Sequence, residues 1–116
     1  MKRSIIYLTK REYENEFHIA NLFAHSLLSK EKALLEYNRL EANQIKSIRK
    51  EFSRLDEIRK ALFPKDMPKE TLNELHNHSV MVDANILAIK YDIDPLIVMM
   101  CCVMQDETCG IIKIQG

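Results

Sequence analysis

The range Lys30–Phe63 reads KEKALLEYNRLEANQIKSIRKEFSRLDEIRKALF and contains neither glycine nor proline. Its second half carries apolar residues at every third or fourth position: Ile45, Ile48, Phe52, Leu55, Ile58 and Leu62. This period predicts one buried face of a long amphipathic helix. Unbroken, the helix would be about 50 Å long, whereas a domain of this size has a radius of gyration of about 13 Å. We therefore expect it to break or to pack along a partner.

The opposite face of this helix is polar and mostly basic, with Lys46, Arg49, Lys50, Ser53, Glu57 and Lys60. A charged face of this kind is typically exposed to solvent. Arg49→Ala is therefore expected to change stability by less than about 0.5 kcal/mol. Loss of the predicted core residue Phe52 is expected to cost about 3–5 kcal/mol.

Upstream of the long helix, Ser4–Thr9 is rich in β-branched and aromatic residues and predicts a short strand. Thr9 and Glu12 have the spacing of a capping box, so a helix is expected to begin near residue 10. Ser29 is the next candidate N-cap. Residues 10–63 are thus expected to form a helical hairpin or a bent rod.

Downstream, the two prolines of residues 64–68 predict a linker. A helix is expected from about residue 69 to 92, and a second from Asp94 onward, with residues 69–105 forming an apolar helical pair. The first of these helices carries apolar residues on several faces and is expected to be central and covered on several sides; those outside its main stripe are Met81, Val82, Ile86 and Ile89. Residues 110–114 predict a second strand, which we expect to pair with the first.

The 116 residues predict one domain, 1–116, with 17 basic and 17 acidic side chains. Its longest apolar run, Leu96–Met104, is too short to span a bilayer, so no membrane insertion is expected. Cys101, Cys102 and Cys109 are odd in number, which argues against a disulfide framework. Without a signal-like N-terminus, the sequence favours a cytoplasmic location.

The histidines, cysteines and glycines do not have the spacing of a metal-binding, catalytic or phosphate-binding site. His18 and His25 would lie about 10 Å apart along a helix, and His76 and His78 would point in nearly opposite directions. The cysteine spacing is not that of a zinc site, and the two glycines cannot form a phosphate-binding loop. The sequence therefore predicts neither an enzyme nor a metal or cofactor site.

The predicted fold is mainly α, with about four helices, one of them long, and short terminal strands. Because Leu96–Met104 is apolar at every helical angle, we expect part of this helix to be covered by a second copy of the chain. The expected interface residues are Leu96, Met99, Met100 and Val103. This pattern favours a non-enzymatic homo-oligomer that acts as an adaptor, chaperone or regulator by binding a protein partner the sequence does not identify.

An alternative function is a small dimeric DNA-binding regulator that uses the basic face: Lys46, Arg49, Lys50 and Lys60. A helix-turn-helix across Asn85–Met104 is disfavoured, because its second helix would offer no polar side chain to the base edges.

Overall fold

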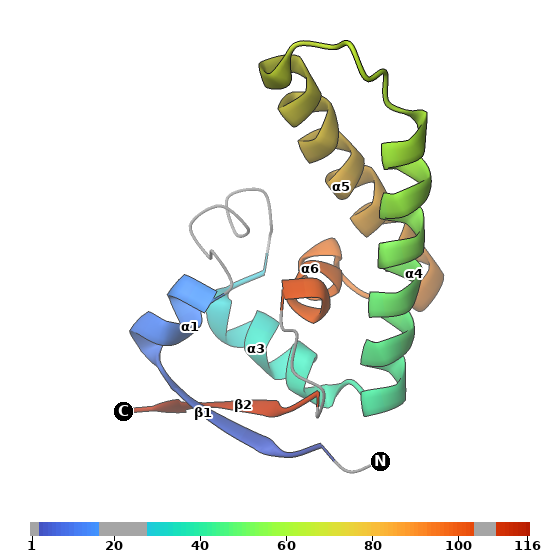
Figure 1. Ribbon diagram of the computed structural model, residues 1–116. Helices are drawn as coiled ribbons and strands as arrows, with labels where there is room; N and C mark the ends of the chain where they lie inside the picture. Colours follow the sequence, from blue (N-terminus) through green and yellow to red (C-terminus); the bar gives the residue numbers. More distant parts are fainter. Residues whose placement is uncertain (1–2, 17–27, 104–108) are drawn as a thin grey trace.

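The computed structural model describes residues 3–16, 28–103 and 109–116, and within them the chain is mainly helical (Figure 1). Five helices and two strands are present in these ranges, against the four helices expected. Their order is β1 (Ile5–Thr9), α1 (Lys10–Glu16), α3 (Lys30–Arg39), α4 (Ala42–Leu62), α5 (Lys69–Tyr91), α6 (Pro95–Val103) and β2 (Ile111–Gln115).

The two strands pair with each other within one chain, as predicted. The pairing is parallel, with Ile5 beside Ile111 and Thr9 beside Gln115. Asn38 of α3 extends the hydrogen bonding on β2, because its side chain donates to the carbonyl of Ile112 at 2.8 Å and accepts from the Ile112 amide at 2.9 Å. The strands thereby tie both ends of the chain to α3 (Figure 1).

The long helix over residues 30–63 breaks, which is one of the two outcomes expected from its length. Leu40 is extended, with φ −69° and ψ 147°, and separates α3 from α4. The Arg3 guanidinium donates to the carbonyls of Tyr37, Asn38 and Leu40 at 3.2, 2.7 and 2.7 Å. These carbonyls lie at the end of α3, where the last carbonyls of a helix lack the usual amide four residues on, and the Tyr37 carbonyl also accepts from the Leu40 amide at 3.2 Å. A side chain near the N-terminus of the chain therefore stabilises the break.

The core lies where α6 packs against α3, α4 and α5. Five of the nine α6 residues are buried: Leu96, Ile97, Val98, Met100 and Cys101. Ala33 and Tyr37 of α3 are fully buried in the same core. The single chain therefore covers most of the helix that was expected to need a second copy.

The apolar face predicted for α4 is buried at only one end. Ile45 and Ile48 are fully buried and Phe52 is partly buried, but Ile58 is 50% exposed and Leu62 is 77% exposed. The second half of α4 and the first half of α5 extend beyond the rest of the molecule (Figure 1). The whole molecule is accordingly elongated, with extents of 48 × 28 × 23 Å. We call α4 and α5 together the arm.

Candidate functional site

The two helices of the arm are held antiparallel by polar contacts between named positions. Arg59 of α4 forms an ion pair with Asp83 of α5, whose side chain is fully buried. Nearer the core, Glu51 accepts hydrogen bonds from Lys90 and Tyr91. These contacts align residue 59 with 83 and residue 51 with 90–91.

The same contacts define the two sides of the arm. Arg49 binds the backbone of α6, whereas Glu51 binds α5. Ile58 and Leu62 follow Glu51 by seven and eleven residues, so the helical period places them on the flank of α4 that carries Glu51. On α5, Leu75, Val82 and Ile89 are spaced seven residues apart and share one flank, which Lys90 borders, whereas the buried Ala84, Leu87 and Ala88 face the other way. The Glu51–Lys90 contact joins these two flanks into one surface, opposite the side where α6 packs.

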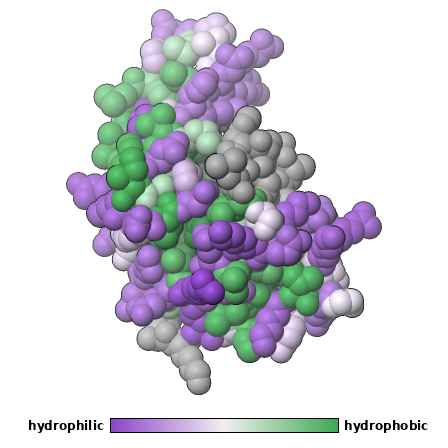
Figure 2. All heavy atoms as spheres, turned by 180° about the vertical axis from the view of Figure 1, so that it is seen from behind, coloured by the Kyte–Doolittle hydropathy of each residue, from purple (hydrophilic) through white to green (hydrophobic). Residues whose placement is uncertain are grey.

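We call this surface the open side of the arm. Seven of the eleven large hydrophobic side chains that are exposed in the described residues belong to α4 and α5, so exposed apolar surface is concentrated on the arm. Figure 2 shows hydrophobic side chains gathered over the arm in the view from behind. The seven residues are Ile58, Leu62, Leu75, Met81, Val82, Ile86 and Ile89.

This exposure corrects the expectation that α5 is central and covered on several sides. Ala84, Leu87 and Ala88 are buried, but Ile89 is 83% exposed and Val82 is 45% exposed. The sequence does show these residues, since Met81, Val82, Ile86 and Ile89 lie outside the main apolar stripe of the helix. It does not show whether another element covers them, and in the structure no described element packs on that flank.

A row of basic residues winds around α4 between the core and the open side. Lys46, Lys50 and Arg54 are exposed and spaced four residues apart. Because each four-residue step turns by about 40° around the helix, Arg54 borders Ile58 on the open side, whereas Lys46 and Lys50 lie on the solvent face that also carries Glu57. The open side is therefore mainly apolar, with a basic residue at its edge.

The four residues expected at a dimer interface lie in or against the core of the single chain. Leu96 and Met100 are 4% and 0% exposed, so they lie inside the single chain. Met99 and Val103 are partly buried and pack against the same core. Leu96 and Met100 therefore have no surface to offer a second copy in this structure.

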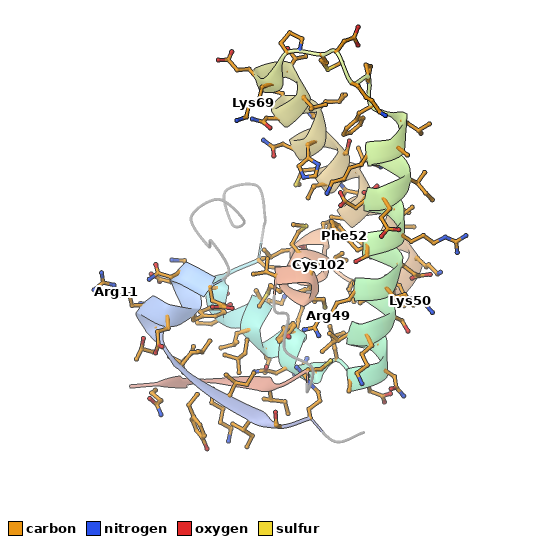
Figure 3. All side chains as sticks on the ribbon, viewed as in Figure 1. Arg11, Arg49, Lys50, Phe52, Lys69 and Cys102 are labelled. Atoms are coloured by element: carbon orange, nitrogen blue, oxygen red, sulfur yellow. The ribbon has the colours of Figure 1, made fainter. Side chains whose placement is uncertain are left out.

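The four residues of the alternative nucleic-acid face do not form one surface. Lys46, Lys50 and Lys60 are exposed, but Lys60 pairs with Asp56. Arg49 turns toward α6, where Nε donates to the Cys101 carbonyl at 2.6 Å and Nη1 approaches Cys109 Sγ at 3.5 Å (Figure 3). The expectation that Arg49 faces solvent is wrong, because the carbonyl of Cys101 and the sulfur of Cys109, both buried residues, attract its guanidinium.

Replacing Arg49 should therefore destabilise the fold. We expect Arg49→Met to lower the free energy of unfolding by about 1.5–3 kcal/mol, the range for hydrogen bonds made by charged groups. Lys50→Met, at the adjacent exposed position, should change it by less than about 0.5 kcal/mol. Urea unfolding followed by circular dichroism would measure both, and equal small effects would contradict the inward position of Arg49.

The cysteines near Arg49 are poorly suited to nucleophilic chemistry. Burial raises the pKa of the Cys101 thiol to about 12, and burial likewise raises the pKa of Cys102 to about 12. Both thiols therefore stay protonated at neutral pH, and the thiolate is the reactive form. Across residues 3–16, 28–103 and 109–116, no three His, Cys, Asp or Glu side chains are grouped to hold a metal ion.

The histidines add no site in the described ranges. His76 is partly buried beside a cavity of about 360 Å³ at the tip of the arm, between the end of α4 and the start of α5. His78 is exposed on α5. His18 and His25 lie outside the described residues.

Comparison with known proteins finds no matching family model, no similar curated protein and no similar solved structure. In the part of the chain that the structure describes, no helix has the length and apolarity needed to cross a membrane.

Proposed function

We propose that this chain is a non-enzymatic interaction protein that works as a homodimer, with the open side of the arm as its dimer surface. The supporting observation is the concentration of exposed aliphatic side chains on one side of a helical pair, led by Leu62 and Ile89. Contiguous apolar patches on soluble proteins mark interaction sites. The free thiols Cys101, Cys102 and Cys109 suit a reducing compartment, and we place the dimer in the cytoplasm.

The area of the open side favours a second copy as its occupant. Two helices of this length, about 30 Å long and about 10 Å apart, present a face of roughly 600 Å² per copy. Two such faces bury about 1,200 Å², the lower bound for a specific protein interface. Packing helical pairs face to face produces a four-helix bundle, and two-fold dimers are the commonest oligomers. We therefore expect a dimer with a micromolar dissociation constant.

A charge placed in the middle of this surface should dissociate the dimer. Val82→Glu is expected to weaken dimerisation at least about 30-fold, since each two-fold dimer would bury two carboxylates without partners. Sedimentation equilibrium across a concentration series would give the dissociation constants. The folded state of the variant is checked by circular dichroism, because Val82 is already 45% exposed and its replacement should leave the fold intact.

The matched control is Leu35→Glu on α3. Leu35 is 51% exposed, which is close to the 45% exposure of Val82, but it lies on a different element. The Leu35→Glu substitution should leave the dissociation constant within about twofold of that of the unmodified chain. If Leu35→Glu disrupts the dimer while Val82→Glu does not, the open side of the arm is not the interface.

A further inference from the structure

The outer part of the arm has no buried residue of its own. We call residues 55–78 the outer arm; they comprise the end of α4, the linker and the start of α5. The structure describes all of them and none is buried, since the last buried residue of α4 is Ile48 and the first of α5 is Ser79. Figure 1 shows this segment extending away from the core. The apolar burial that stabilises the core therefore stops short of the outer arm.

The two helices of the outer arm are loosely packed at the tip and joined by charge toward the core. Phe63 and Leu72 are partly buried and line the cavity of about 360 Å³ at the tip, so their side chains do not fill the space between the helices. Toward the core, the ion pair of Arg59 with the buried Asp83 joins the helices. Among the described residues, Asp83 Oδ2 has no hydrogen-bond partner. A buried ion pair adds little net stability, because each charge loses its hydration.

The start of α5 also has little helical stability of its own. Its N-cap residue is Pro68, whose side chain makes no capping hydrogen bond. A helix of this length is marginal in water unless it packs against something. Seven of the twelve residues 69–80 are weak helix formers: Thr71, Asn73, His76, Asn77, His78, Ser79 and Val80. Opening the outer arm should therefore cost less free energy than opening the core.

We infer that the outer arm opens and closes in the monomer and that the second copy holds it closed. This inference rests on the proposed function, because the closing contacts are those of the dimer. Ile58, Leu62 and Leu75 of the outer arm are 50%, 77% and 36% exposed and lie on the open side. A second copy that covers them supplies the apolar contacts that are missing between the two helices. Since only the closed arm presents these residues together, dimerisation shifts the arm toward its closed form.

Amide hydrogen exchange of the full chain measures this coupling. At about 1 µM, amides of the outer arm should exchange faster than those of α3 and α6. At about 100 µM, they should exchange at least about fivefold more slowly than at 1 µM, because the dimer excludes the open form. Val82→Glu, which is expected to stay monomeric, is the control and should show no such slowing.

Sedimentation of the same samples separates the two ways in which this test can fail. If the dimer forms but exchange in the outer arm does not slow, or is already as slow as in α6 at 1 µM, the coupling is wrong and the proposed function stands. If the chain stays monomeric, both are wrong.

The Arg59–Asp83 ion pair provides a second test that leaves the exposed apolar residues unchanged. Arg59→Met leaves the Asp83 carboxylate without its cation, which favours the open arm and should weaken dimerisation about tenfold or more. Lys60→Met is the matched control, because the ion pair of Lys60 with Asp56 is largely exposed. The helical period places Lys60 on the side of α4 away from Ile58, so its replacement should change the dissociation constant less than about threefold.

The double variant Arg59→Met/Asp83→Leu distinguishes loss of the ion pair from general damage to the arm. Apolar residues in place of a buried ion pair often preserve or raise stability. The double variant should therefore keep the arm closed and dimerise at least as tightly as the unmodified chain. A folded Arg59→Met chain with an unchanged dissociation constant, or a double variant that dimerises no more tightly than the single one, would overturn the coupling.

Discussion

Replacing Met100 with lysine should unfold the chain. Met100 is fully buried in the core, where α6 packs against three other helices. An ammonium group there would be placed among the apolar residues of the core, and burying an unpaired charge costs more than about 4 kcal/mol. Domains of this size have total stabilities of about 5–15 kcal/mol, so the variant would lose most of its stability. Circular dichroism and urea unfolding would measure this loss.

The volume-conserving variant Met100→Leu is the matched control and should cost less than about 1.5 kcal/mol. If Met100 instead formed a dimer interface, the lysine variant would be a folded monomer. A Met100→Lys protein with unchanged helicity and unfolding midpoint would contradict the burial of α6 in the single chain.

Removing the Arg3 side chain should give the second large effect. Besides the three carbonyls at the end of α3, Arg3 donates to the carbonyls of Cys109 and Gly110 at 2.6 and 2.9 Å. The same guanidinium lies over the Tyr37 ring, 5.2 Å from its centroid. Arg3→Ala would leave five carbonyls without this donor, and we expect a loss of about 2–4 kcal/mol, less than the sum of five bonds because solvent can reach some of them.

Arg11→Ala is the control for Arg3→Ala, because Arg11 is exposed on α1 and points away from the body (Figure 3). It should change the free energy of unfolding by less than about 0.5 kcal/mol. Amide exchange at residues 5–8 should speed up in the Arg3 variant alone, since Arg3 holds the start of both strands to α3. Equal exchange in the two variants would show that the contacts of Arg3 do not support the sheet.

Short-range features of the fold were predictable because the residues that make them are neighbours in the sequence. Thr9 and Glu12 form the expected capping box, with reciprocal bonds of 2.9 and 3.1 Å. Ser29 accepts from the Lys32 amide, and Asp94 accepts from the Leu96 amide. The pairing of the terminal strands also follows, because each short strand needs a partner for its backbone groups.

The position of the break between α3 and α4 was not predictable from local sequence. Neither Leu40 nor Glu41 is a helix breaker, and the contacts that stabilise the break come from Arg3, more than thirty residues away. The inward turn of Arg49 has the same kind of cause, since its partner carbonyl belongs to Cys101.

The position of the exposed surface could not be predicted because it depends on which helix covers which. The argument that the apolar α6 needs a second copy omitted α3, whose Ala33 and Tyr37 are fully buried in the core shared with α6. With α6 covered, most of the exposed apolar residues are those of the arm. They include Ile58 and Leu62, which lie on the helix face that was expected to be buried. The expectation of a dimer thus moves from α6 to the arm, where it remains a proposal.

The most direct test of that proposal is sedimentation equilibrium of the unmodified chain from about 1 to 100 µM, the range that resolves micromolar association. We predict a mass that rises with concentration toward twice the 13.6 kDa of one chain. A single species at 13.6 kDa throughout this range would contradict the account, because the open side of the arm would then not bind a second copy.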